Sequence, residues 1–297
     1  MKIRVLGSSA GGGLPQWNCG GEHSVRARAD DPDVPRRSQP SIAISSGDGR
    51  WTIVNASPDV RSQLADFPGL HPRPGTRDIP LDNILITNAD LHHTIGLLVL
   101  REALPYRVLT TAWIRNALVE NNIAFRLLEP AFHSVKLDQP FPLDREGVLE
   151  AKLFPVPGRV PTYLREIVNN SAETTLGLRV IDKRTGKRLV YAPGLQTLDS
   201  GTMAELAQAD LRFVDGTFFS ADEPLAMRPG AVDAFAMGHV PISGPDGSLT
   251  RYRGLPGRTF YIHINNTNPI LDAQSPERAQ VEAAGIQIAE DGMNLEL

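Results

Sequence analysis

Short runs of alternating apolar and polar residues, separated by glycine turns, dominate the first sixty residues of the chain. Residues 2–6 form the first run and lead into a glycine-rich loop at residues 7–13. Residues 41–45 alternate strictly, and a Gly-Asp-Gly turn joins them to residues 51–55. An apolar residue at every second position is typical of a half-buried strand. The pattern therefore predicts one strand followed by an antiparallel hairpin.

The rest of the chain alternates predicted helices with predicted strands. The polar segment 55–59 favours the start of a helix that continues through Leu64. Further helices are expected at 94–102, 199–208 and 276–284, and further strands at 83–87, 149–155, 176–181, 188–191, 211–214 and 259–264. This alternation predicts a mixed α/β chain.

Two long segments show no regular periodicity. Residues 23–40 are rich in Arg, Asp and Pro, and we expect them to cross the surface without regular structure. Residues 220–255 resemble one irregular loop. Because loops of that length in compact domains are usually lids or parts of sites, we expect this loop to contribute to function.

Composition places the chain among ordinary globular proteins. It has 297 residues, of which 41% are hydrophobic and 22% charged, and this excludes disorder and a collagen-like repeat. No linker or low-complexity tract divides it, so we expect a single domain over residues 1–297. The six-residue apolar run at 95–100 is far shorter than a spanning helix, and no secretory apolar stretch follows Met1. We therefore expect a cytoplasmic protein with no membrane partner.

Charge and cysteine content narrow the function further. Thirty basic and 34 acidic residues give a net charge of −4, which is the wrong sign for nonspecific nucleic-acid binding. The single cysteine, Cys19, excludes an internal disulfide and a CxxC zinc site. Any metal bound by this chain alone must therefore use histidine and carboxylate ligands.

The most informative residues follow the predicted strand at 83–87. Asp90, His92 and His93 supply one carboxylate and two imidazoles within four residues. This set suits Zn²⁺, Fe²⁺, Mn²⁺ or Cu²⁺. In the alternative interpretation, the two histidines are a solvated pair at a helix start, with Asp90 as the N-cap.

Three further candidate site residues lie at the ends of other predicted strands or in a turn. His263 ends a predicted strand and precedes a run of asparagines, Asp215 follows the strand at 211–214, and His239 lies in a tight turn. A lone histidine in such a place is more often structural than a ligand. Several histidines at strand ends together favour a metal site. We expect no metal role for the remaining histidines, His23, His71 and His133.

Two groups of segments resemble known families. Residues 86–98, ITNADLHHTIGLL, resemble a degraded HxHxDHxxG signature of the metallo-β-lactamase superfamily. Longer segments resemble the pyrroloquinoline quinone biosynthesis protein B family, namely MKIRVLGSSAGGGLPQWNC, MGHVPISGPDGS and IHINNTNPILDAQSPER. The second resemblance extends over essentially the whole chain. It implies a four-layer αββα metallo-β-lactamase-like sandwich with a metal held by loops at one edge of the two sheets.

The resemblance also implies a reaction. Members of the family are thought to hydroxylate the tyrosine ring of a crosslinked Glu–Tyr unit from a ribosomal peptide, using a non-haem metal and O₂. The implied substrate is thus a crosslinked or processed precursor peptide, or a small tyrosine-derived molecule. One divalent transition metal is expected, with Fe(II) favoured and Zn(II) or Mn(II) as alternatives.

The resemblance assigns roles by position. Asn88 and Asp90 occupy the places of the first two superfamily histidines, and His92 occupies that of the aspartate. The implied metal ligands are Asp90, His92, His93 and His263. His239 is the implied catalytic base, with Asp215 as a supporting or proton-transfer group. The implied substrate contacts are Asn88, Asn265 and Asn266.

The chain departs from the family in its N-terminal loop. Relatives usually carry a CxCxxC cluster that holds structural zinc, whereas this chain has Cys19, Gly21 and Ser24. We therefore expect that zinc to be absent. Two other functions stay open at this point: a hydrolase on the same fold, and a metal-poor protein for carriage or transport of the quinone product. The oligomeric state also stays open, with a homodimer as one alternative.

Overall fold

The computed structural model describes residues 1–102, 106–227 and 230–297. Within these residues, seven strands form the first sheet. Its first three ladders are antiparallel and its last three are parallel. The strands, in spatial order, are β14 (Asn294–Glu296), β1 (Lys2–Gly7), β2 (Ser41–Ser45), β3 (Trp51–Val54), β4 (Leu81–Leu85), β5 (Arg107–Thr110) and β6 (Phe132–Ser134).

The second sheet repeats this arrangement. The described residues again give seven strands, with three antiparallel ladders followed by three parallel ones. Their order is β7 (Pro140–Pro142), β8 (Leu149–Pro155), β9 (Leu176–Asp182), β10 (Arg188–Ala192), β11 (Leu211–Asp215), β12 (Arg258–Ile262) and β13 (Ile286–Ile288). The first sheet therefore comes mainly from the first half of the chain, and the second sheet from the second half.

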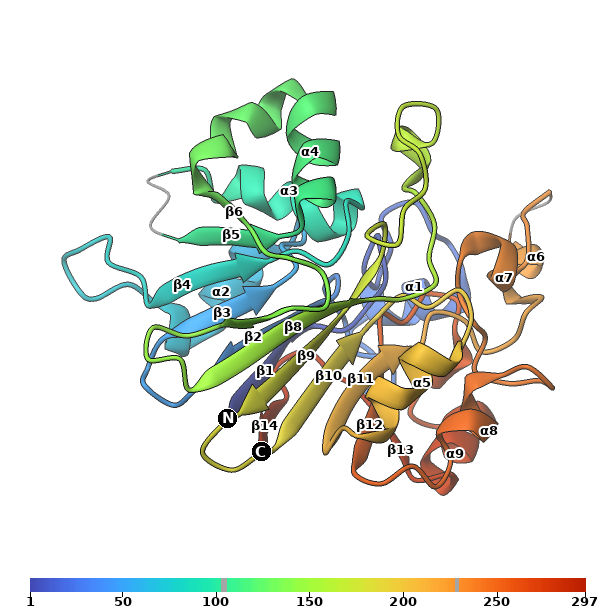
Figure 1. Cartoon of the computed structure of the whole chain (residues 1–297). Helices are drawn as coiled ribbons and strands as arrows, with labels where there is room; N and C mark the ends of the chain where they lie inside the picture. The colour runs from blue at the N-terminus through green and yellow to red at the C-terminus, as the bar shows by residue number, and fades with distance from the viewer. Residues whose placement is uncertain (103–105, 228–229) are drawn as a thin grey trace.

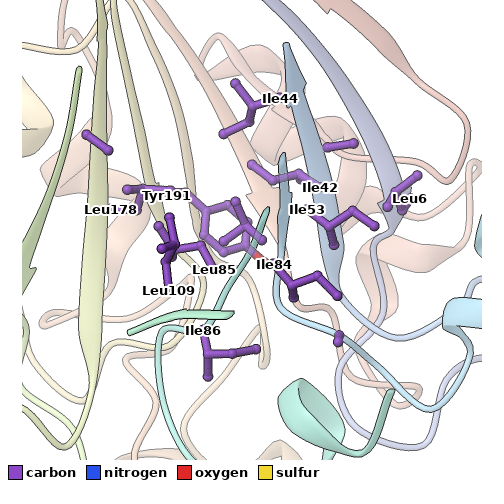
Figure 2. Close-up of a cluster of buried hydrophobic side chains, with 14 of the residues drawn as sticks. Leu6, Ile42, Ile44, Ile53, Ile84, Leu85, Ile86, Leu109, Leu178 and Tyr191 are labelled. Atoms are coloured by element: carbon purple, nitrogen blue, oxygen red, sulfur yellow. The ribbon is translucent and has the colours of Figure 1, made fainter. Parts of the chain in front are cut away.

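The two sheets pack face to face through apolar side chains. Tyr191 of β10 lies between them, with Leu178 on its own sheet and Ile42, Ile53 and Ile84 on the opposite one (Figure 2). All five side chains are essentially inaccessible to solvent. Burial of this apolar area drives the sheets together, at about 25 cal/mol for each Å² removed from water.

Helices cover the outer faces of both sheets, which confirms the predicted four-layer αββα sandwich (Figure 1). On the first sheet they are α2 (Val60–Ala65), α3 (Leu91–Val99), α4 (Ala112–Asn121) and the 3₁₀ segment η2 (Ile123–Ala131). On the second they include α5 (Ser200–Ala207), α8 (Ser248–Tyr252) and α9 (Pro276–Ala283). The remaining helical segments are α1 (Glu22–Arg28), α6 (Glu223–Met227), α7 (Ala234–Met237), η1 (Pro68–Leu70), η3 (Thr162–Leu164) and η4 (Pro269–Leu271). Among the described residues, no helix combines the length and apolarity needed to cross a bilayer.

Several predicted boundaries were wrong, for identifiable reasons. Helix α2 begins at Val60, directly after the predicted capping segment 55–59, and ends one residue beyond the predicted Leu64. The Asp59 carboxylate accepts from Gln39 instead of capping α2. Strand β4 ends at Leu85 rather than at residue 87, and the Thr87 amide donates to the Asn55 side chain instead of to a neighbouring strand.

Both segments predicted to lack regular structure contain helices. Helix α1 lies within the predicted surface excursion and is anchored by Arg26, which pairs with Asp31 and Asp272. Helices α6, α7 and α8 lie within the predicted loop 220–255, of which residues 228–229 lie outside the described residues. These helices have four to five residues each, which is too short to give a periodic sequence signal.

Helix α3 is fixed to the first sheet by its backbone. The Gly96 amide donates to the Ala56 carbonyl at 2.9 Å, and the Ala56 amide donates to the His93 carbonyl at 2.7 Å. A Cβ on Gly96 would lie 2.3 Å from the Ser57 carbonyl oxygen, so only glycine permits this approach. The contact also sets the position of the histidines at the start of α3.

We expect Gly96→Ala to lower the free energy of unfolding by about 3 kcal/mol, because backbone atoms that cannot yield block the new methyl group. Gly201→Ala is the matched control, since a Cβ at this helical glycine of α5 would lie 3.7 Å from its nearest neighbour. Its effect should stay below about 1 kcal/mol. Urea unfolding of both variants checks the difference, and equal stability losses would contradict this account of the α3 contact.

Candidate metal centre

Loops at one edge of the two sheets bring the predicted site residues together. His92 and His93 lie in the first turn of α3, after β4 of the first sheet. His263 follows β12, and Asp215 ends β11 of the second sheet. His239 follows α7 directly after Gly238. The site therefore lies where the two halves of the chain meet.

Three of these histidines form a cluster. Each of His92, His93 and His263 offers a ring nitrogen, and these nitrogens all lie within 4.8 Å of one another. The Nε2 atoms of His92 and His263 are 3.0 Å apart, although 171 positions separate the residues in sequence. Two nitrogens bound to one metal at about 2.1 Å lie about 3.0–3.4 Å apart, so the pair has the spacing of ligands to a shared ion.

Hydrogen bonds fix which nitrogen of His93 carries the proton. Its Nδ1 lies 2.8 Å from Asn88 Oδ1, an amide oxygen that also accepts from the Asp90 backbone amide at 3.0 Å. Nδ1 must therefore donate, which leaves a lone pair on Nε2. Nε2 is buried and has no hydrogen-bond partner among the described residues. A buried nitrogen with a free lone pair beside two other imidazoles fits a metal ligand.

Thr217 and Asp215 fix His263 in the same way. The Thr217 hydroxyl donates to Asp215 Oδ1 at 2.6 Å, so Thr217 Oγ1 accepts from His263 Nδ1 at 2.7 Å. His263 also has a left-handed φ of 61°, an uncommon backbone conformation that turns the chain away from β12. The result is again an Nε2 lone pair directed at the cluster.

Asp215 is fully buried and has no free acceptor position. Its Oδ2 accepts from the Leu195 amide and from His239 Nδ1, and its Oδ1 accepts from the Thr217 amide and hydroxyl. A carboxylate has about four lone-pair sites, so these four bonds saturate it. Asp215, His239 and His263 also form a compact group of possible metal ligands. Because the facing atoms of Asp215 and His239 already bond to each other, we interpret this group as a support for the histidine cluster.

Burial keeps the clustered imidazoles neutral. It lowers the pKa of His92, and it lowers the pKa of His93 and His263 far below the usual value, with a further decrease from neighbouring histidines. For His239, burial alone would also lower the pKa, but the charge and hydrogen bond of Asp215 outweigh it and raise the pKa. Neutral imidazole is the form that binds metals.

The cluster opens into a small cavity of about 140 Å³. Asn88, Asp90 and all four histidines line it, together with the loop between β8 and β9 and the backbone near Gly238. Asp90 occupies the N-cap position of α3, but its side chain makes no cap hydrogen bond and lies outside the three-histidine cluster. Its charge raises the pKa of His92 and His239.

The other residues expected to contact substrate lie beside this cavity. Asn265 and Asn266 line a neighbouring groove, on the side of the loop that contains Gly11 and Cys19. The Asn265 amide donates to Thr267 Oγ1 at 2.6 Å, and the Asn266 carbonyl accepts from His23 Nδ1, 3.2 Å away. Among the described residues, Asn265 and Asn266 therefore support loops around the site, and Asn88 orients His93.

In the N-terminal loop, the residues at the positions of the CxCxxC cluster form hydrogen bonds instead of a cysteine site. The Cys19 thiol accepts from the Gly21 amide at 3.3 Å. The buried Ser24 hydroxyl accepts from the Gln16 amide at 3.4 Å, and from the Asn266 amide at 3.5 Å. Ser24 thus connects this loop to the segment that follows His263.

Sequence reasoning did not assign a role to Thr217. The only sequence signal was its position two residues after Asp215, at the end of a strand. Arg159 and Arg165, which also line the cavity, had no signal because they lie in an unpatterned loop.

Glu223 of α6 is an ionisable group next to the site loops. It accepts from the Phe219 amide at 2.6 Å and from the Thr267 hydroxyl. Burial raises the pKa of Glu223 to about 7, and the hydrogen bonds from Thr267 and Phe219 only partly oppose this rise. The folded protein therefore holds a proton on Glu223 at pH values where the unfolded chain does not.

Because its folded pKa lies above the ordinary value of 4.5, Glu223 should make the protein less stable as pH rises from about 4.5 to about 7. The expected loss in the free energy of unfolding is on the order of 2 kcal/mol, and it is complete above about pH 7. Glu223→Gln resembles the protonated carboxyl, since its oxygen can accept from the Phe219 amide while its NH₂ group donates to Thr267 Oγ1. It should be more stable than the parent chain at pH 8 and show a flatter profile. Urea unfolding at pH 5 and pH 8 measures this, with exposed Glu120→Gln as the control; parallel profiles for parent and Glu223→Gln would contradict it.

Comparisons with known proteins are consistent with this arrangement. A model of the β-lactamase superfamily domain matches residues 50–264. The chain is 43% identical to coenzyme PQQ synthesis protein B of Ruegeria pomeroyi and 41% identical to that of Methylobacterium radiotolerans, over the full length of both chains in each case. It also resembles the crystal structure of Zn²⁺-bound PqqB from Methylobacterium extorquens, with a TM-score of 0.93, 38% identity and full coverage of both chains.

Proposed function

Because this chain belongs to the coenzyme PQQ synthesis protein B family, within the β-lactamase superfamily, we propose that it acts in pyrroloquinoline quinone biosynthesis as a metal-dependent oxygenase. Its substrate in this proposal is a tyrosine-derived ring. The observation that supports it most strongly is the cluster of three neutral imidazoles, two of them with fixed Nε2 lone pairs, in the lining of a cavity of about 140 Å³.

We propose that His92, His93 and His263 hold one divalent metal. Asn88 and Thr217 orient His93 and His263 by accepting from their Nδ1 atoms. Such outer hydrogen bonds to metal-bound histidines typically change metal affinity or activity 10–100-fold. Asp90 provides a negative charge beside this set. The Zn²⁺-bound relative supports a metal in this family.

The bound metal would supply O₂ activation, which requires a redox-active ion such as Fe(II) and is not possible with zinc alone. The reaction replaces a ring hydrogen by a hydroxyl group. One oxygen atom of O₂ enters the ring and the other leaves as water, so two electrons must come from an external reductant, together with two protons.

We propose His239 as the base that takes a proton from the phenol. Its Nδ1 donates to Asp215 at 2.7 Å, which leaves the Nε2 lone pair available at the cavity. The ring of His239 also stacks on that of His263, with centroids 5.3 Å apart, so the base lies next to the proposed metal. Asp215 has no free acceptor position, and we therefore assign it the positioning of His239 and Thr217.

The test of this function is metal analysis combined with O₂ uptake. Protein purified anaerobically and reconstituted with Fe²⁺ should contain about one iron per chain. With ascorbate as reductant, it should consume O₂ in the presence of tyrosine-containing substrates. Two zinc ions per chain and no O₂ uptake would instead favour a hydrolase. Failure to bind metal under any condition would favour a carrier of the quinone product.

We expect His239→Ala to keep the metal and lose turnover by about 10²–10⁴-fold, the usual contribution of a general base. Metal content and O₂ uptake measured on the same preparation check this. His71→Ala is the control, because His71 is exposed and bonds only to the Ala65 carbonyl within the described residues. Loss of metal from the His239 variant, or full turnover, would contradict the assignment.

A further inference from the structure

Two arginines line the histidine cavity, and neither is paired with a carboxylate of the described residues. Arg159 is half-buried and Arg165 is exposed, and both belong to the loop between β8 and β9. Within the part of the chain that the structure describes, neither forms an ion pair or a side-chain hydrogen bond. By contrast, half-buried Arg26 pairs with two aspartates. An arginine that lines a cavity and has no acceptor among the described residues is suited to bind an anion.

The side chain of Arg159 lies against Gly238, the residue before His239. Gly238 has a φ of 97°, and a Cβ there would lie 3.1 Å from Arg159 Cδ. The stem of Arg159 therefore packs against this glycine, and a Cβ there would displace it by a few tenths of an ångström. Arg159 is thus held next to the backbone of the proposed base.

Arg165 is placed by a second contact of the same loop. It follows the short helix η3, and the hydroxyl of Tyr163 in this helix donates to the Ala89 carbonyl at 2.8 Å. Because Ala89 lies between Asn88 and Asp90, this bond fixes the loop over the segment that carries the histidines. Both arginines consequently reach the same cavity from one anchored loop.

Size and charge indicate which molecule would use them. A cavity of about 140 Å³ is large enough for one aromatic ring, since an apolar cavity of roughly 150 Å³ holds benzene. A larger molecule must extend beyond the space that the ring fills, and the two arginines of the lining are available to its remaining groups. Among the described residues, the charged side chains that line the cavity apart from Asp90 are these two cations, so the cavity favours a negative group.

We propose that Arg159 and Arg165 bind the carboxylate of an amino-acid-type substrate whose aromatic ring occupies the histidine cavity. The inference rests on the proposed function for the identity of the ring. Beyond the proposed function, we expect that recognition of the substrate requires a free carboxylate next to its ring. A guanidinium matches a carboxylate with two parallel hydrogen bonds, which makes this pairing both strong and directional.

Binding of two matched probes tests the proposal. N-acetyl-tyrosine and N-acetyl-tyrosinamide have the same phenol and differ in one carboxylate. Calorimetry under anaerobic conditions should give at least about tenfold tighter binding of the acid, as expected for a charge-assisted hydrogen bond. The acid-to-amide ratio should fall towards one in Arg159→Gln and Arg165→Gln, and Arg159→Lys should retain part of it. Arg61→Gln, an exposed arginine on α2, should leave the ratio unchanged.

Three outcomes would overturn the proposal. The first is equal affinity of the parent chain for acid and amide. The second is a ratio that survives both glutamine substitutions in variants with an unchanged circular dichroism spectrum. The third is tighter binding of inorganic phosphate than of N-acetyl-tyrosine, with the phosphate affinity lost in the same variants, which would identify a phosphate site.

The test separates this proposal from the proposed function. Anaerobic binding needs no turnover, so a preserved acid-to-amide ratio without O₂ uptake contradicts the hydroxylase and supports the carboxylate site. Equal rates of O₂ uptake with acid and amide, at equal affinity, contradict the carboxylate site and leave the hydroxylase intact.

Discussion

His93→Ala protein is expected to retain its fold and to contain less than a tenth of the metal bound by the parent chain. His93 Nε2 is buried, has no hydrogen-bond partner in the part of the chain that the structure describes, and lies in the cluster with His92 and His263, so its removal deletes one of three proposed ligands. Loss of an outer hydrogen bond to a ligand alone costs 10–100-fold in metal affinity, and loss of the ligand itself should exceed that. Elemental analysis after Fe²⁺ reconstitution measures the effect.

The control for this experiment is His133→Ala. His133 is exposed on β6 and bonds to the Ala131 carbonyl, so its removal should leave the metal content unchanged. Circular dichroism and the unfolding midpoint show whether the His93 variant is folded. A folded His93→Ala protein with normal metal content would refute the ligand assignment.

Asp215→Asn is expected to lower both stability and activity, although the two side chains have nearly the same shape. Every acceptor position of Asp215 is used, and two of its donors are backbone amides, those of Leu195 and Thr217. An asparagine must direct its NH₂ group at one of these amides, which then loses its partner in a fully buried position. We expect a loss of about 2–4 kcal/mol in the free energy of unfolding.

The same substitution should reduce turnover by at least about tenfold, because His239 and His263 both depend on Asp215 for their orientation. Asp199→Asn makes the identical chemical change at the N-cap of α5, where asparagine caps as well as aspartate, and should be neutral. Equal stability of the two variants in urea would show that the buried carboxylate is not required.

Strand positions were largely predictable from sequence, because a buried face imposes a two-residue period. Residues 149–155 were predicted as a strand and are β8, with the same ends. The edge strands β13 and β14 have three residues each and were missed, since pairing with a neighbour rather than a local pattern creates them. Helix α3 begins three residues earlier than predicted. Its start is determined by backbone hydrogen bonds to Ala56, which have no local sequence signal.

The candidate site was predictable as a set of residues but not as an arrangement. Histidines next to strand ends drew attention to His93 and His263, because strand ends are where loops carry chemistry. The 3.0 Å approach of His92 to His263 depends on how the two sheets pack, which no local pattern reports. The saturation of Asp215 likewise depends on Leu195, a residue twenty positions away with no polar side chain.

The two sheets repeat the same order of ladders, and the cluster joins the half that carries His93 to the half that carries His263. An ion bound there would act as a crosslink between two sheets whose facing surfaces otherwise meet through apolar side chains. Binding of the ion would then raise the free energy needed to separate the sheets. The increase is about 4 kcal/mol when the free metal concentration is a thousand times the dissociation constant. Metal supply would therefore control how long the folded protein persists as well as how fast it turns over.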